Sequence, residues 1–137
     1  MTKEFEFVDD LTSDVLFRAY GKTLEQVFEN SAKALFSIIC EIEQLEPTKS
    51  FWLEIEAESH EELLYEWLSR LLAESEIRGL FFSRFVVSIE GNKLKARVYG
   101  SKADPKIGKV QVKAITKYKF GLVKQNSLYV ATVSCDI

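Results

Sequence analysis

Residues 23–42, TLEQVFENSAKALFSIICEI, decide the fold because they define the first of two amphipathic helices. Thr23 and Gln26 have the spacing of a capping box, in which each side chain can bind a backbone N–H group of the first turn. Apolar residues then recur at helical spacing, so one side of this helix is expected to face a core. These residues are Leu24, Val27, Phe28, Ala32, Leu35, Phe36, Ile39 and Ile42.

A second helix is predicted from the same signals after Ser59. Ser59 and Glu62 repeat the capping-box spacing, and Gly79 can adopt the left-handed conformation that ends many helices. The apolar stripe of this helix consists of Leu63, Leu64, Trp67, Leu68, Leu71 and Leu72. We therefore expect both helices to cover another layer with one face and to leave the other face polar.

The remaining segments alternate between apolar and polar residues, as strands with one buried face do. They are residues 5–8, 15–20, 51–57, 85–89, 94–98, 110–116, 118–124 and 128–137. Gly91-Asn92 predicts a tight hairpin turn between two of them. Runs of strands with two helices between them predict one α+β domain over residues 1–137, a two-layer sandwich whose mostly antiparallel or mixed sheet is covered on one face by the helices.

Length and composition fit an ordinary globular protein, since 47% of the 137 residues are hydrophobic and 28% are charged. The first residues lack the pattern of a secretory signal, and no stretch approaches the roughly 18 apolar residues of a membrane span. We therefore expect a cytoplasmic protein. Cys40 and Cys135 have neither metal-motif spacing nor the density of a disulfide scaffold, which predicts buried, reduced thiols.

The balance of charge changes sign after Asn92. Residues 1–92 hold 8 Lys and Arg against 19 Asp and Glu, whereas residues 93–137 hold 10 against 2. The basic residues of the second part, here called the Lys ladder, are Lys93, Lys95, Arg97, Lys102, Lys106, Lys109, Lys113, Lys117, Lys119 and Lys124. This ladder indicates either a surface for nucleic acid or an acidic partner, or the solvated face and edges of a sheet, and the sequence leaves both interpretations open.

The motifs of common enzymes are missing from the sequence. The single histidine, His60, falls at the first position of the second helix, where a solvated polar residue is ordinary. There is no Gly-x-Ser-x-Gly elbow and no glycine-rich phosphate loop. We therefore expect that this chain is not an enzyme and that it helps another protein to carry out chemistry.

Two carboxylates stand at unusual positions. Asp14 directly precedes the strand at residues 15–20, and Asp136 is followed only by Ile137, whose main-chain carboxylate is a further anionic group. If the last strand pairs near the strand after Asp14, three carboxylates converge, and a hard divalent ion would neutralise them. Ca²⁺, Mg²⁺ or Mn²⁺ would fit this oxygen shell, and Zn²⁺ less so, because neither a histidine nor a cysteine pair joins the set. The plainer interpretation is a turn aspartate and a frayed acidic end.

At these residues the chain resembles the archease family. Residues 10–15, DLTSDV, match the opening block of that family, an acidic residue followed by His-Thr-Ala-Asp-Val. Further blocks follow in the family order at residues 18–25, 28–36, 61–68, 82–85, 99–100, 104–105, 112–116 and 136–137. The resemblance covers nearly the whole chain. It implies that Asp14, Asp136 and the chain end at Ile137 bind a divalent metal.

The resemblance also implies a partner. Archeases assist the RNA-splicing ligase that joins tRNA halves, by promoting guanylylation of the ligase histidine and sustaining multiple turnover, and they have also been viewed as chaperones of tRNA methyltransferases. Contact with tRNA would then be indirect or through the Lys-rich last third of the chain. Lys113, in the block at 112–116, would meet phosphate or the ligase, or else be a solvated strand lysine. An RNA-binding module and a metal-dependent hydrolase are the alternative functions.

The sequence departs from the family pattern at three positions. Leu11, Ile107 and Tyr118 stand where archeases often have histidine. The resemblance therefore carries no role of those imidazoles over to this chain. Metal binding survives these losses better than proton transfer would, because the expected ligands are carboxylates.

Overall fold

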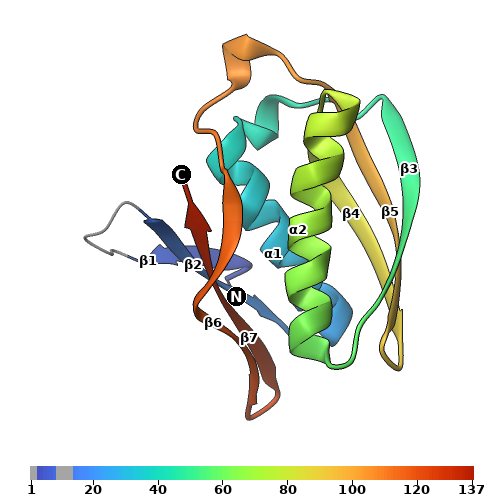
Figure 1. Ribbon diagram of the computed structural model, residues 1–137, viewed down its shortest axis with the longest axis vertical. Coiled ribbons are helices and arrows are strands. Elements are labelled where there is room, and N and C mark those ends of the chain that lie inside the picture. The colour runs from blue at the N-terminus through green and yellow to red at the C-terminus, as the bar shows by residue number, and fades with distance from the viewer. Residues whose placement is uncertain (1–2, 9–13) are drawn as a thin grey trace.

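The computed structural model describes residues 3–8 and 14–137, in which strands and helices form an α+β fold (Figure 1). The strands are β1 (Phe5–Val8), β2 (Asp14–Gly21), β3 (Lys49–Glu56), β4 (Leu80–Glu90), β5 (Lys93–Lys102), β6 (Ala114–Gln125) and β7 (Leu128–Asp136). The helices are α1 (Leu24–Ile39) and α2 (His60–Arg78), with short 3-10 helices η1 (Ile42–Gln44) and η2 (Pro105–Ile107). Neither α1 nor α2 is long and apolar enough to cross a membrane.

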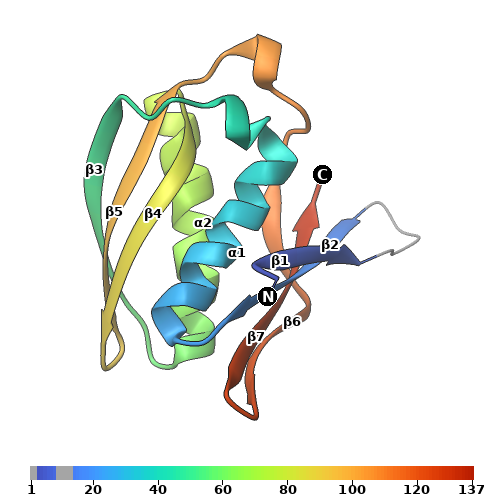
Figure 2. The same ribbon diagram turned by 180° about the vertical axis from the view of Figure 1, so that it is seen from behind.

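The strands form two antiparallel sheets, with the orders β1-β2-β7-β6 and β3-β5-β4. Both helices lie between the sheets, as the two opposite views show (Figures 1 and 2). The predicted α+β class, with antiparallel strands and two covering helices, is confirmed. The strands were expected to form one sheet, but they form two. Helix α1 therefore packs on β2 of one sheet and on β4 of the other, and even its polar residues Asn30 and Ser31 are buried.

The helix boundaries follow the predicted caps. The Thr23 hydroxyl accepts a hydrogen bond from the Gln26 N–H at 3.1 Å, and the Gln26 side chain accepts one from the Lys22 N–H at 2.7 Å. The Ser59 hydroxyl caps α2 by accepting a hydrogen bond from the Glu62 N–H at 3.1 Å, whereas the Glu62 carboxylate binds the Lys117 ammonium. Gly79 ends α2 with φ of 65°. The apolar stripe predicted to run to Ile42 overshoots α1, because the chain becomes extended at Cys40 before it enters η1.

The boundaries predicted for residues 110–124 were wrong. Residues 110–113 lie outside the sheet, since the N–H groups of Lys109 and Val110 bind the carbonyl groups of Ile39 and Ile38 at the end of α1. From Ala114 the chain forms one long strand, β6, whose register with β7 shifts between Thr116 and Gly121. Lys119 lies within this irregularity and has a positive φ of 54°.

One hydrophobic cluster joins both sheets to the helices. Its largest fully buried side chains include Trp67, Phe17, Phe28, Phe36 and Phe82. The Trp67 indole on α2 donates a hydrogen bond to the Phe28 carbonyl on α1 at 3.0 Å, so the one polar group of this side chain is satisfied inside the core. Cys40 and Cys135 are buried free thiols, as predicted.

Candidate functional site

The register of β2 with β7 places Asp14 directly opposite Asp136. The neighbouring residues Val15 and Cys135 face the core, so the two carboxylates lie on the sheet face turned away from the helices, where both are partly exposed. Directly opposed residues of antiparallel strands have Cβ atoms about 4.5–5.5 Å apart. The strand pairing on which the predicted metal site depended is therefore present, and metal binding itself stays a prediction.

Hydrogen bonds fix the backbone and one side chain of this acidic pair. The Ser134 hydroxyl, which is fully buried, donates to the Asp14 carboxylate at 3.5 Å, which is longer than the roughly 2.5–3.0 Å usual for such bonds, so this contact is weak. On the other side of β7, the Lys113 N–H donates to the Asp136 carbonyl at 2.7 Å. Three adjacent strands therefore meet at this edge, and Figure 1 places the C-terminus beside the start of β2.

The donor atoms at this edge suit a hard cation. Two opposed carboxylates repel each other, and oxygen ligands are those that Ca²⁺ and Mg²⁺ prefer. Within residues 3–8 and 14–137 no group of three or more His, Cys, Asp or Glu side chains could hold a metal ion. A complete site at the Asp14–Asp136 pair therefore needs further oxygen atoms, and the main-chain oxygen atoms of Ile137 follow directly after Asp136.

The thiol beside the acidic pair is not a ligand candidate. Burial of Cys135, followed in importance by the negative charge of Asp14, raises the pKa of this thiol to about 12. Its side chain also points into the core, on the opposite face of β7 from the Asp136 carboxylate, so Cys135 adds no sulfur ligand. The site has the chemistry of an oxygen-only cation site.

The remaining predicted residues are spread over the molecule. The main chain of Lys113 lies at the acidic pair, but its exposed side chain lines a shallow pocket with Tyr65 and Glu76 of α2. Ile107 lies in η2, and Tyr118 is exposed on β6 with the Lys119 ammonium 5.2 Å from its ring centre. Leu11 and the rest of residues 9–13 lie outside the described residues.

His60 has a structural contact. Its Nε2 atom lies 2.9 Å from the Gly91 carbonyl oxygen, which links the start of α2 to the turn between β4 and β5. This contact gives His60 a structural role at the start of α2.

The Lys ladder does not form one surface. Lys93, Lys95 and Arg97 lie on β5 in the three-stranded sheet, whereas Lys117, Lys119 and Lys124 lie on β6 in the other sheet. Some members are engaged with neighbouring groups: the Lys109 ammonium donates to the Ser37 carbonyl at 2.8 Å, and the Lys117 ammonium to the Glu62 carboxylate at 2.8 Å.

Sequence reasoning missed one exposed aromatic residue, Trp52, which stands beside the β5 members of the Lys ladder. Trp52 on β3 lies directly opposite Arg97 on β5, and its side chain is 56% exposed. The available signal was a tryptophan at a polar position of the alternating strand 51–57. An aromatic residue at such a position faces solvent or a ligand, because its neighbours on both sides point to the core.

Comparisons with known proteins match nearly the whole chain to one protein family. The model of the Archease protein family matches residues 5–137. The archease of Pyrococcus abyssi is 42% identical over 119 residues, covering 82% of this chain and 84% of that protein. The archease of Sulfurisphaera tokodaii is 32% identical, covering 98% of this chain and 99% of that protein.

Solved structures agree with the fold. The solution structure of protein 1598 from Methanobacterium thermoautotrophicum has a TM-score of 0.89 at 33% identity, covering 99% of this chain and 100% of that one. A crystal structure from Thermotoga maritima, described as "an archease, possible chaperone", has a TM-score of 0.70 at 18% identity. The match covers 100% of this chain and 98% of that one, and at this identity it supports the fold alone. On the family match and the relatives, this chain belongs to the archease family.

Proposed function

We propose that this chain is an accessory protein that stimulates guanylylation and multiple turnover of an RNA-splicing ligase. The cation site of this proposal consists of Asp14, Asp136 and the main-chain carboxyl group of Ile137, with Ca²⁺ as the first choice of ion. Membership of the archease family supports the choice of partner. The opposition of Asp14 and Asp136 in the β2–β7 register is the single observation that carries the site.

The role of the chain itself is to hold the ligands in place. Asp136 is the last residue of β7, which is hydrogen-bonded to strands on both sides, so its position is set by the sheet rather than by a loose tail. The Ser134 hydroxyl on β7 donates a long hydrogen bond to the Asp14 carboxylate, and the Lys113 N–H, just before β6, donates one to the Asp136 carbonyl. A bound cation would supply a fixed positive charge beside anionic groups of the ligase or its nucleotide.

The guanylylation rate of the ligase, measured with and without this protein, tests the proposal. We expect intact protein to raise the rate, and Asp136→Asn to reduce that stimulation by about tenfold or more, since loss of even an outer residue of a metal site has effects of that size. A version extended by a few residues past Ile137 should lose stimulation in the same way, because the added peptide bond removes the main-chain carboxylate.

Glu58→Gln is the matched control, since Glu58 is an exposed carboxylate in the loop before α2. It should stimulate like the intact protein. A guanylylation rate that intact protein leaves unchanged would refute the ligase as partner. Full stimulation by Asp136→Asn, or calorimetric Ca²⁺ binding that is equal in Asp136→Asn and intact protein, would refute the site.

A further inference from the structure

The outer face of the β3-β5-β4 sheet exposes apolar and aromatic side chains beside cations. The strand registers align two neighbouring rows across this face, Ser50–Tyr99–Arg84 and Trp52–Arg97–Val86. Trp52 is 56% and Val86 46% exposed, whereas the next residues along their strands, Leu53 and Val87, are buried in the core. We call the set Trp52, Arg84, Val86, Arg97 and Tyr99 the aromatic-basic face.

Cations lie over both rings. The Arg97 guanidinium lies 5.5 Å from the ring centres of both Trp52 and Tyr99, and its position is fixed by hydrogen bonds to the Ser50 hydroxyl at 3.0 and 3.2 Å. The Arg84 guanidinium lies 5.1 Å from the Tyr99 ring centre. The face therefore combines flat aromatic rings with positive charge close to them.

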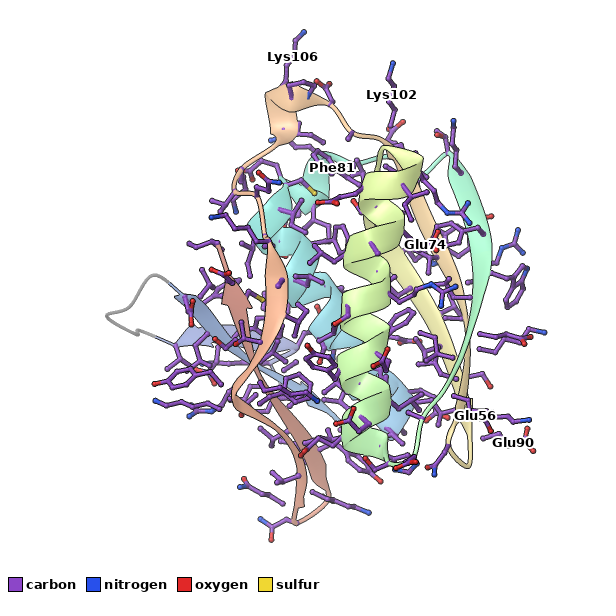
Figure 3. The ribbon with its side chains drawn as sticks, viewed as in Figure 1. Glu56, Glu74, Phe81, Glu90, Lys102 and Lys106 are labelled. Carbon is purple, nitrogen blue, oxygen red and sulfur yellow. The ribbon has the colours of Figure 1, made fainter. Side chains whose placement is uncertain are left out.

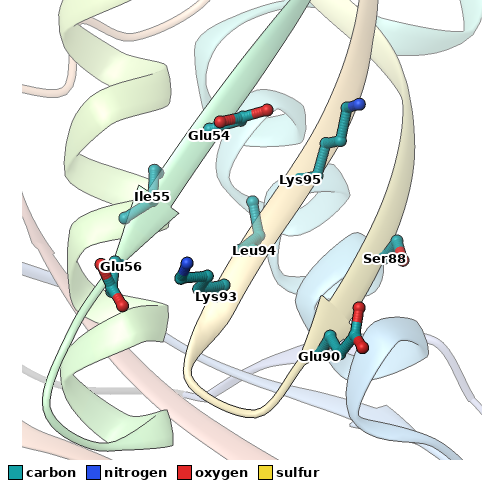
Figure 4. Close-up of a pocket in the computed structure, with 8 residues that line it drawn as sticks. All are labelled: Glu54, Ile55, Glu56, Ser88, Glu90, Lys93, Leu94 and Lys95. Carbon is teal, nitrogen blue, oxygen red and sulfur yellow. The ribbon is translucent and has the colours of Figure 1, made fainter.

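Charge is divided along this sheet. Residues 49–52, 80–86 and 97–102, which form one end, include Lys49, Arg84, Arg97 and Lys102 and no acidic residue. At the other end Glu56 and Glu90 flank Lys93, and Figure 3 shows these two glutamates far from Lys102. Figure 4 shows the mixed charges that line the pocket there. The aromatic-basic face thus lies in the cationic half, which suits a polyanion.

We propose that the aromatic-basic face binds single-stranded RNA. Unpaired bases can stack on Trp52 and Tyr99, while Arg84 and Arg97 meet the phosphates, which is how open antiparallel sheets bind single strands. In a duplex the base faces are already stacked on each other and cannot reach the rings. The choice of RNA over DNA rests on the proposed function, whereas the stacking surface itself does not.

Intrinsic fluorescence gives a direct readout, because Trp67 is fully buried and Trp52 is exposed. Titration with an oligouridylate of about ten nucleotides should quench the Trp52 emission and raise the anisotropy of a labelled strand. Trp52→Ala should weaken binding at least about fivefold, the lower end for loss of one base–aromatic stack, and Trp52→Phe should retain most of the affinity. Arg97→Gln should weaken binding and make it less sensitive to salt.

Two matched controls lie on the other sheet. Tyr118 is 48% exposed and also has a cation beside its ring, so Tyr118→Ala removes a similar aromatic–cation pair. Lys124→Gln removes one positive charge from β6, as Arg97→Gln does from β5. Both controls should bind the oligouridylate within about twofold of the intact protein. Circular dichroism of each variant checks that the fold is retained.

Several outcomes would overturn the assignment: no binding of the oligouridylate, equal affinity of Trp52→Ala and intact protein, or duplex RNA binding as tightly as the single strand. Tighter binding of the same sequence as DNA would also overturn it. Stronger quenching of Trp52 by a polyglutamate peptide would assign the face to an acidic protein instead. These titrations contain no ligase, so their failure and a failure of ligase stimulation are separate results.

Discussion

At the scale of single residues, burial controls the reactivity of Cys135. Desolvation and the Asp14 charge raise its pKa to about 12, and desolvation raises that of Cys40 to about 11. The thiolate is the reactive form. We expect iodoacetamide at about pH 8 to label both thiols at least a hundredfold more slowly in folded protein than in guanidinium chloride, as measured by intact mass. Fast labelling of Cys135 in folded protein would contradict the burial and the raised pKa of this thiol.

The candidate site could be predicted in part from single residues. Asp14 and Asp136 stand out in the sequence because one precedes a strand and the other nearly ends the chain. Their opposition depends on the β2–β7 register, which no local pattern specifies. Trp52 was missed for a related reason: local alternation gives its direction, whereas the cations beside it come from β5. Contacts between distant strands were the part that sequence alone could not supply.

At the scale of elements, Glu74 stabilises the last turns of α2. Its carboxylate accepts hydrogen bonds from Arg78 at 2.8 Å and Arg70 at 3.3 Å, one turn to either side. The Arg78 contact, and then the Arg70 contact, lower the pKa of Glu74 below its ordinary value of 4.5. Both guanidinium groups are 40% or more exposed, so solvent screens the pairs and each contributes only about 0.3–0.5 kcal/mol.

We therefore expect Glu74→Gln to lower the free energy of unfolding by about 0.5–1 kcal/mol at pH 7. Because the folded pKa is depressed, the stabilisation is present above the unfolded pKa and is lost as pH falls through the folded value. The difference from intact protein in urea unfolding should thus shrink at acidic pH. Glu76→Gln, an exposed neighbour on α2, should change stability by less than about 0.5 kcal/mol. A deficit of Glu74→Gln that is the same at both pH values would exclude this role.

Elements with local signals were predicted well. Thr23, Ser59 and Gly79 fixed helix ends because caps depend on a few adjacent residues. The start of β6 was missed, because the bonds of residues 109–110 to α1 hold the chain away from the sheet. The division of the strands into two sheets was also not predicted, since alternation shows that a strand has a buried face but not which strands share it.

At the scale of the whole molecule, the Asp14–Asp136 pair joins the first strands to the last, because β2 and β7 are neighbours in one sheet. A cation bound there would stabilise the folded chain against unfolding, since the unfolded chain does not hold the two carboxylates together. At a Ca²⁺ concentration of about 100 times Kd the gain is about 2.7 kcal/mol. We expect Ca²⁺ to raise Tm by several degrees in a thermal unfolding experiment.

We expect Asp136→Asn to be more stable than intact protein without metal and less stable than intact protein with Ca²⁺. Without metal, the substitution removes a like charge from directly opposite Asp14, which should raise the free energy of unfolding by a few tenths to about 1 kcal/mol. With Ca²⁺, intact protein should become the more stable, because the variant has lost a ligand. Glu58→Gln should follow intact protein in both conditions. If Ca²⁺ raised the Tm of Asp136→Asn as much as that of intact protein, the cation would not be bound between β2 and β7.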